Sequence, residues 1–167
     1  VEVNAGPGLL MHIKPESGTP HPVGKAIVDH LFAPSANGRI PVVGICGDTA
    51  ITTPVSQLLA QMLMLANPHI GVANTQGLYL GHRKVHDLPE QAWELRQRLL
   101  MNRQVTTAVF ENPPRHILTE GLVYDRCQVG VVTGVPKAHG LEDLYITEDE
   151  QMFNVVRTQV DVVLREG

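Results

Sequence analysis

VVGICGDTAITTP, residues 42–54, joins a run of apolar residues to a glycine, a short polar turn and a pair of threonines before a proline. A strand that ends in such a turn before a helix is the framework of a phosphate-binding loop. Backbone N–H groups and the helix N-terminus then point at the anion. Thr53 and Pro54 predict the start of that helix, with a hydroxyl cap and proline in the first turn. The alternative is an ordinary strand-to-helix turn.

The loop lacks the lysine that a phosphate-binding loop uses. After the strand the residues are Gly47, Asp48, Thr49, Ala50, Ile51, Thr52 and Thr53. Lysine reaches the outer phosphates, and isoleucine at position 51 forgoes a charged hydrogen bond worth roughly 1.5–3 kcal/mol. The Asp48 carboxylate would repel the phosphates. Ala50 would cost roughly 1–2 kcal/mol if its backbone had to be left-handed. These changes favour a degenerate nucleotide loop.

Composition indicates a globular domain and excludes several functions. The chain has 167 residues, of which 43% are hydrophobic and 18% charged, and its formal net charge is −4. No run of Lys or Arg is long enough to follow a nucleic-acid backbone. No apolar stretch approaches the ~20 residues of a membrane span, so we expect a cytoplasmic protein without membrane contact. Cys46 and Cys127 are expected to be buried reduced thiols rather than a disulfide or a reactive pair.

The chain changes texture near residue 38. Glycines and prolines in the first 38 residues exclude a long helix or central strand, although VGKAIVDHLF, residues 23–32, predicts a short amphipathic helix. From Ile40 onward apolar strands alternate with helices, which predicts an α/β fold whose mostly parallel sheet is flanked by helices. We therefore predict an extended arm over residues 1–38 and a nucleotide-binding core over residues 39–167.

Particular segments carry these predictions. Strands are predicted at residues 40–45, 69–73, 77–81, 105–110 and 129–133. The helix after the loop is predicted to bury a stripe made of Val55, Leu58, Leu59, Met62 and Leu65. A second helix is predicted over residues 87–100, with Asp87 and Glu90 spaced as in a capping box, and a third from Thr147. The third helix would turn Phe153, Val156, Val160 and Val163 inward.

The chain resembles the cyanophycin synthetases, ATP-dependent ligases that build an aspartate–arginine polymer. Matching stretches include VEVNAGPGLLMH (1–12), GRIPVVGICGDTAITT (38–53), NTQGLYLGHRKV (74–85), ENPPRHILTEGLVYDRCQVGVVTG (111–134) and AHGLEDL (138–144), in family order. In that family an ATP-grasp ligase domain is followed by a domain similar to the Mur peptide ligases. The resemblance implies that residues 1–38 are the tail of the ATP-grasp domain with a connecting arm. Residues 39–167 would then be a truncated Mur-ligase-like core.

The resemblance also implies site residues at the start of the chain. Glu2 and Asn4 match the acidic residue and asparagine that ligate magnesium in ATP-grasp ligases. Their period-two spacing points both side chains to the same side of a strand, and their oxygens suit magnesium. ATP and magnesium would therefore belong to the ATP-grasp domain of the parent enzyme.

The Mur-like core keeps only part of three family motifs. The family loop is Gly-Thr-Asn-Gly-Lys-Thr-Thr, so Gly47, Thr52 and Thr53 survive. Glu111 keeps the expected magnesium-ligand position in ENPPRH, where two prolines replace residues that shape the site. His139 survives in GVPKAH, but the family asparagine and aspartate have become Gly134 and Ala138. The hydrophobic framework persists while polar positions are lost, which implies a fold retained for its shape.

The resulting hypothesis is a non-catalytic structural domain that binds no cofactor of its own. The parent would be closest to the shortened second-type cyanophycin synthetase, which polymerises β-aspartyl-arginine dipeptides. Expected partners are the upstream ATP-grasp domain, a second copy in a homo-oligomer, and the aspartate–arginine polymer as the parent's substrate. One alternative is an active ATP-dependent ligase half that adds a single amino acid, arginine. Another is a free-standing scaffold or binding module for the polymer.

Other polar residues are predicted to have modest roles. The histidines lack metal-ligand spacing, and His82 and His86 are expected in a solvated basic hairpin. Trp93 is expected to anchor packing or a subunit contact. A basic face near a helix end, available to the helix dipole or to an acidic polymer, is predicted for Arg96, Arg98 and Arg103.

Overall fold

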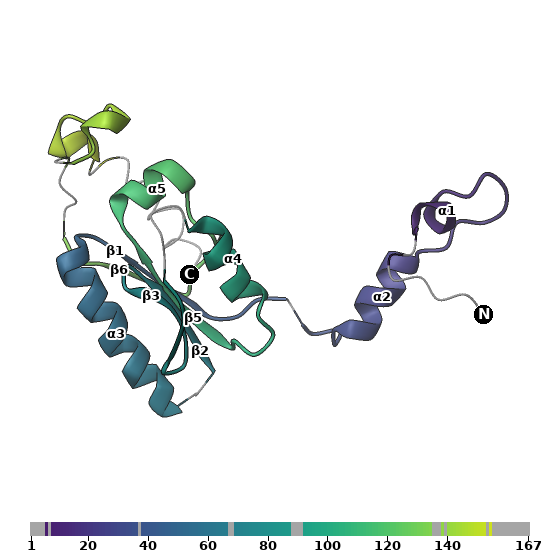
Figure 1. Ribbon diagram of the computed structural model, residues 1–167. Coiled ribbons are helices and arrows are strands. Elements are labelled where there is room, and N and C mark those ends of the chain that lie inside the picture. Colours follow the sequence, from purple (N-terminus) through teal and green to yellow (C-terminus); the bar gives the residue numbers. More distant parts are fainter. Residues whose placement is uncertain are drawn as a thin grey trace. The chain divides into compact units, whose positions relative to one another are not determined.

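The computed structural model describes residues 6, 8–36, 38–66, 69–87, 92–134, 138, 140–152 and 154. The chain divides between Arg39 and Ile40 into two units, and each is described by itself (Figure 1). Whether the first unit is the tail of an ATP-grasp domain stays a prediction.

The first unit holds two short helices, α1 (Leu10–Ile13) and α2 (Val23–Leu31). The amphipathic helix predicted at residues 23–32 is present as α2, and Lys25 forms an ion pair with Asp29 one turn later. Neither helix has a buried residue. Ile27, Val28 and Leu31 are each about half exposed, so α2 presents an apolar face without a core of its own.

The second unit is built on a six-stranded sheet in the order β4-β3-β2-β5-β1-β6. The strands are β1 (Val42–Cys46), β2 (Ile70–Asn74), β3 (Gly77–Leu80), β4 (Arg83–His86), β5 (Thr107–Asn112) and β6 (Val129–Val132). β1 pairs in parallel with β5 and β6, and β2 pairs in parallel with β5. β3 and β4 extend the sheet as an antiparallel hairpin. The predicted α/β fold with a mostly parallel sheet is confirmed.

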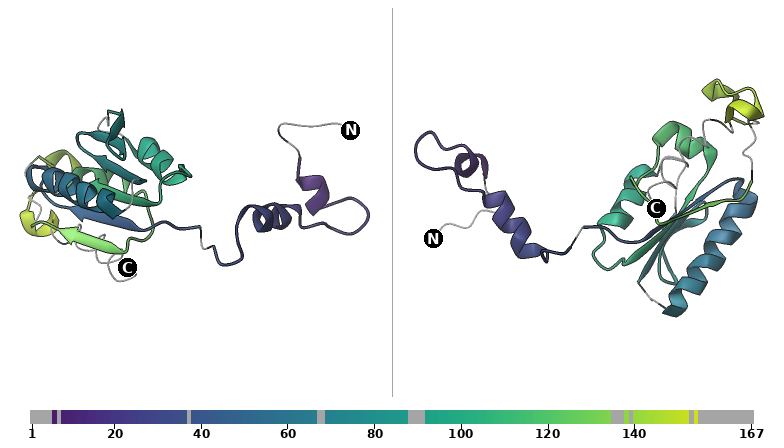
Figure 2. Two further views of the ribbon diagram at one scale, coloured as in Figure 1. Left: turned by 90° about the horizontal axis from the view of Figure 1, so that it is seen from below. Right: turned by 180° about the vertical axis from the view of Figure 1, so that it is seen from behind.

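Helices cover both faces of this sheet. The long helix α3 (Thr49–Ala66) lies on one face, and α4 (Trp93–Met101) and α5 (Pro114–Glu120) lie on the other (Figures 1 and 2). Successive residues of a strand point to opposite faces. Accordingly Val42 packs in the core beside Leu99 of α4, whereas Val43 packs in the core beside Ala60 of α3. This two-sided burial explains the continuous apolar run of β1.

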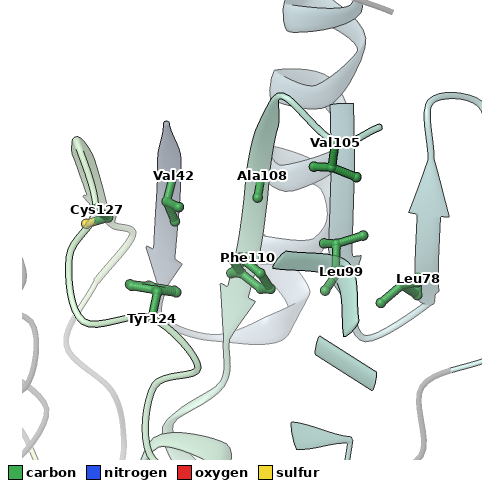
Figure 3. Packing of buried hydrophobic residues seen from close by; sticks show 9 residues of the cluster. Val42, Leu78, Leu99, Val105, Ala108, Phe110, Tyr124 and Cys127 are labelled. Carbon is green, nitrogen blue, oxygen red and sulfur yellow. The ribbon is translucent and has the colours of Figure 1, made fainter. Parts of the chain in front are cut away.

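Figure 3 shows the core on the α4 side of the sheet. The rings of Phe110 and Tyr124 lie 5.4 Å apart between their centroids, in a tilted arrangement. A Cβ on Gly44 would come within 2.2 Å of the Tyr124 hydroxyl oxygen, so that strand position has no room for a side chain. The same hydroxyl accepts a 2.7 Å hydrogen bond from Asn112 Nδ2. Tyr124 is thereby fixed between β1 and β5.

Two predictions about α3 are wrong. The helix begins at Thr49 rather than Thr53, and Pro54 lies inside it. Its buried residues are Thr52, Thr53, Ser56 and Ala60, while Leu58, Met62 and Leu65 of the expected inward stripe are exposed. The helix is turned this way because its threonines and serine form hydrogen bonds on the sheet side. Periodicity alone favoured the more apolar face.

Three boundary predictions also need correction. α4 begins at Trp93, and Asp87 pairs with Lys84 instead of capping the helix; Glu90 lies outside the described residues. The strand at residues 129–133 is an exposed edge, with Val129 and Val132 about half exposed, rather than a buried strand. Near the third predicted helix, the Thr147 backbone N–H is bonded by Gln151 rather than Glu150. Phe153, Val156, Val160 and Val163 lie outside the described residues.

One further expectation concerns length. Among the described residues, α3 is an 18-residue helix long and apolar enough in composition to cross a membrane. The sequence pattern had indicated no such stretch. Length and composition of this kind are weak evidence, because core helices of water-soluble domains also meet them.

Candidate functional site

The loop of residues 47–53 lies at the carboxyl ends of the parallel strands. β1 and β5 pair so that Ile45 is opposite Glu111, which brings the loop beside Glu111. Ligand sites of open α/β sheets form at this edge. Gly47 has φ = 147°, and a Cβ there would meet Thr133 Oγ1 at 2.1 Å. Glycine is therefore required for the strand to turn into α3.

Asp48 caps the first turn of α3 with its own atoms. Its carboxylate Oδ1 accepts a 2.9 Å hydrogen bond from the backbone N–H of Ala50. Its carbonyl oxygen accepts hydrogen bonds from the backbone N–H groups of Ile51 at 2.9 Å and Thr52 at 2.8 Å. These are the amides that a phosphate-binding loop directs at its anion. Here a side-chain carboxylate occupies that role, as N-cap residues commonly do.

The helical start also changes the expectation for Ala50. Because α3 begins at Thr49, Ala50 is in ordinary helical conformation, and Tyr145 is the one non-glycine residue with positive φ among those described. The left-handed penalty considered for Ala50 does not arise. The loop has become one turn of helix, which suits alanine.

Glu111 is the centre of a buried hydrogen-bond network. Its Oε1 accepts hydrogen bonds from Thr52 Oγ1 at 2.5 Å and Thr53 Oγ1 at 2.7 Å. Its Oε2 accepts a 2.6 Å hydrogen bond from the backbone N–H of Thr75, whose hydroxyl also bonds Thr53. Glu111 and Thr52 are completely buried. The three surviving polar residues therefore come together, and they tie α3, β5 and the β2–β3 turn to one carboxylate.

These residues do not fit a nucleoside triphosphate with its magnesium. A carboxylate and hydroxyls are suitable ligands for magnesium, but both hydroxyls donate to Glu111 in the structure. Asp48 occupies three amides of the first turn. Ile51 is 49% exposed and carries no charge toward an anion. The group as arranged serves as a structural joint, with a hydrogen-bond donor for each carboxylate oxygen.

The ENPPRH segment places its basic residues away from the loop. Pro114 starts α5, directly after Pro113 in extended conformation. Arg115 forms a two-bonded ion pair with Asp143, including a 2.9 Å bond from Nη1. Arg115 therefore links α5 to the segment around η1 (Glu142–Leu144).

Arg96 is not part of a solvated basic face, contrary to the sequence prediction. Only 4% of it is exposed, because α5 packs over this side of α4. A guanidinium N–H donates to His116 Nδ1 at 2.8 Å, which requires His116 to present a lone pair there. Burial lowers the pKa of Arg96, and the charges of Glu120 and Glu111 oppose that change. Arg98 and Arg103 are exposed.

The GVPKAH segment contributes packing at the position of the family aspartate. Ala138 is buried in an apolar cluster with Cys46, Ile117 and Met152. Its backbone N–H donates to Asp149 Oδ1 at 2.6 Å. His139 lies outside the described residues, as do Glu2 and Asn4, so their proposed roles stay predictions.

The remaining polar candidates lie where the sequence analysis placed them. His82 and His86 belong to the β3–β4 hairpin, which exposes Arg83 and Lys84. No group of three or more His, Cys, Asp or Glu side chains able to hold a metal occurs in the described part of the chain. Trp93 is 37% exposed at the start of α4.

Both cysteines are free and buried, as the sequence analysis expected for reduced thiols. Burial raises the pKa of the Cys46 thiol to about 12. Burial also raises the pKa of Cys127, against a hydrogen bond from the Gly44 backbone. Raised thiol pKa values disfavour the reactive thiolate.

Two functional groups of this site were missed from the sequence. Asp48 was weighed as a repulsive charge, although an aspartate directly before a helix is also a common N-cap. Thr75 was not singled out, because its contribution is a backbone N–H supplied by the β2–β3 turn. No side-chain pattern marks a backbone donor.

Comparison with known proteins gives a consistent set of relatives, although no family model matches the chain. It is 34% identical over 168 residues to a cyanophycin synthetase of Crocosphaera subtropica, covering 100% of the chain and 19% of that protein. It is 33% identical over 168 residues to one of Trichormus variabilis, covering 100% of the chain and 18% of that protein. It is 34% identical over 164 residues to one of Synechocystis sp., covering 98% and 18%. The chain thus spans about a fifth of the length of these relatives.

Proposed function

Because the chain belongs to the cyanophycin synthetase family over its whole length, we propose that it is a non-catalytic, Mur-ligase-like structural segment of an ATP-dependent ligase. The parent reaction would be amide-bond formation that extends an aspartate–arginine polymer. In such chemistry ATP phosphorylates a carboxylate first, because a free carboxylate is a poor electrophile. We propose that the parent's ATP and magnesium bind at its ATP-grasp domain, in the cytoplasm.

The observation that carries this proposal is the capping of α3 by Asp48. Three amides of the first turn are already hydrogen-bonded to this residue. A phosphate would have to displace the Asp48 carboxylate, which it also repels, and would find Ile51 where a lysine should neutralise it. Each effect disfavours binding, and the surviving Thr52, Thr53 and Glu111 already satisfy one another.

The parent reaction is proposed to be the polymerisation of β-aspartyl-arginine dipeptides, as in the second-type enzymes. Two altered motifs support loss of chemistry in this segment with retention of its fold. Ala138 packs in an apolar cluster at the family aspartate position, and two prolines begin α5. The core around them is well packed: Phe110, Ile45 and Val109 are completely buried.

The first unit supports the proposal of a partner domain. Its described helices have no buried residue, yet Leu10, Met11 and Leu31 are more than half exposed. Exposed apolar side chains on an amphipathic helix indicate a surface that another body covers. We propose that this body is the upstream ATP-grasp domain, to which Glu2 and Asn4 would contribute magnesium ligands.

One observation favours the alternative of an active ligase half that adds arginine. Two hydroxyls and a carboxylate converge at the carboxyl edge of the sheet, and these are the ligand types that magnesium prefers. Activity would require the Thr52 and Thr53 hydroxyls to turn away from Glu111 and Asp48 to release its amides. A binding module for the polymer is the third reading, and the exposed Arg98 and Arg103 are its candidate contacts.

Calorimetric titration of the 167-residue chain with MgATP tests the proposal. We expect no saturable heat, and an intact relative with the loop lysine should give a binding isotherm as the positive control. Micromolar binding that is lost on Thr52→Val would contradict the proposal and favour the active ligase half. Titration with an aspartate–arginine polymer in place of ATP tests the binding module separately.

A further inference from the structure

The outward face of α3 is apolar along its whole length. Ile51, Leu58, Met62 and Leu65 are exposed to 49%, 60%, 60% and 90%. The helix Thr49–Ala66 contains no charged side chain at all. A helix on the surface of a domain normally carries charged and polar residues on the face away from the core. Contiguous apolar patches of this kind mark interaction sites.

The spacing of this outward stripe is symmetrical. The stripe consists of Ile51, Pro54, Leu58, Met62 and Leu65. The intervals are three, four, four and three residues, so the pattern is the same from either end with Leu58 at its centre. Residues three and four apart are neighbours on a helix, and the stripe therefore forms one continuous line about 21 Å long.

We propose that α3 packs antiparallel against α3 of a second copy of this chain, about a two-fold axis at Leu58. Ile51 of each copy then lies opposite Leu65 of the other, and Pro54 lies opposite Met62. An interface of this symmetry must be self-complementary. The palindromic spacing satisfies that condition, and the absence of charge means that no like charges meet across the axis.

Neither a lipid surface nor an unrelated protein matches these observations as well. A helix that lies on a membrane carries basic residues on its polar face, whereas the inner face of α3 bonds to the sheet through Thr52 and Thr53. Those bonds also hold the helix in the domain and prevent its insertion into a bilayer. A partner of different sequence would not require spacing that is symmetrical about one residue.

The stripe includes the altered position of the loop. Ile51 stands where the family has lysine, and a lysine there would place a charge at each end of the paired helices. The same residue that removes a phosphate contact therefore completes the apolar stripe. The pairing does not depend on the proposed function, since it holds whether or not the chain binds ATP.

Sedimentation of the 167-residue chain tests the pairing. We expect a monomer–dimer equilibrium whose dissociation constant rises at least about tenfold in Leu58→Glu and in Leu65→Glu. Met101→Glu is the matched control, because Met101 is 73% exposed on α4 and should leave the equilibrium unchanged. A monomeric wild-type chain, or a dissociation constant that neither α3 variant alters, would overturn the proposal. Circular dichroism establishes that each variant is folded, and two α3 positions guard against one failing to fold.

Cross-linking tests the register. Leu58→Cys should form a disulfide between copies when an oxidant is added, because the axis passes through this position. Gln97→Cys, at an exposed position of α4, should not, and the native Cys46 and Cys127 are buried. A dimer in which Leu58→Cys fails to cross-link would overturn the antiparallel arrangement. Binding of monomeric chain to phosphatidylcholine vesicles, lost in Leu58→Glu, would overturn the pairing itself. If MgATP binds while the dimer persists, the proposed function fails and the pairing stands.

Discussion

At the scale of single residues, Glu111 explains how a former ligand position persists without its chemistry. A buried carboxylate is unfavourable unless its oxygens accept hydrogen bonds. Glu111 accepts three, from two side chains of α3 and one backbone N–H of the β2–β3 turn. Replacing it strands those donors, so selection for stability alone is enough to keep the residue.

Removing this carboxylate is expected to be strongly destabilising. Glu111→Ala leaves three buried donors without an acceptor and should lower the free energy of unfolding by about 3 kcal/mol. Glu111→Gln retains an acceptor oxygen and should cost about half as much, because its amide N–H₂ faces a donor. Urea unfolding followed by circular dichroism measures both. An alanine variant as stable as the wild type would show that the network contributes nothing.

The buried thiol of Cys46 should make the chain less stable in alkali. Its pKa is raised from 9.0 to about 12 by burial. The unfolded chain ionises this thiol near pH 9 while the folded chain keeps it neutral. Its contribution is therefore fully present below pH 9 and is lost as the pH rises toward 12. Burial likewise raises the pKa of Tyr124, which adds to the loss above the usual tyrosine range.

The size of the Cys46 effect can be measured by difference. Between about pH 8 and about pH 10, this thiol should remove about 1.4 kcal/mol of stability. Cys46→Ala should flatten the pH dependence of the urea unfolding free energy by that amount, whatever its effect at neutral pH. Parallel pH profiles for the variant and the wild type would mean that the thiol titrates normally in the folded chain.

At the scale of elements, α3 separates what the sequence predicts from what it does not. The apolar runs of β1, β2, β3 and β5 were placed because strands buried between two helical layers are apolar throughout. For α3 both faces are apolar, so periodicity did not indicate which face turns inward. Thr52, Thr53 and Ser56 decided this through hydrogen bonds to the sheet edge, and those depend on contacts distant in sequence. The same holds for Arg96, whose burial requires α5.

The Asp48 cap is expected to contribute to the stability of this element. Asp48→Ala removes the acceptor for the Ala50 amide and should cost about 1 kcal/mol of unfolding free energy. Asp48→Asn keeps an acceptor oxygen and should cost less. Thermal or urea unfolding of the two variants provides the comparison, with Glu94→Ala, at an exposed site of α4, as a control. Equal stability of Asp48→Ala and wild type would mean that the first turn is not capped by this side chain.

At the scale of the whole molecule, the two units differ in how they are stabilised. Every residue of the three buried apolar clusters comes from position 40 or later. The first unit has a helix with an apolar face and no described core. Texture alone placed the change near residue 38, because glycines and prolines are visible in any sequence, whereas the partner of an exposed helix is not.

Removal of residues 1–39 should therefore leave the core intact. We expect the urea midpoint and slope of residues 40–167 to match those of the whole chain, because no cluster residue is lost. A lower midpoint, or loss of cooperative unfolding, would show that the first unit supports the second. The solubility of the two forms indicates in addition whether the exposed face of α2 promotes association.

The amides at the start of α3 give the most direct measurement of the central claim, that this turn is closed to phosphate by Asp48. The chain, at 18.3 kDa, is within reach of amide NMR with ¹⁵N labelling. On addition of MgATP we expect no saturable shift of the Ala50, Ile51 and Thr52 signals in the wild type. A shift of these three amides that saturates with nucleotide would contradict the claim and identify a working phosphate site.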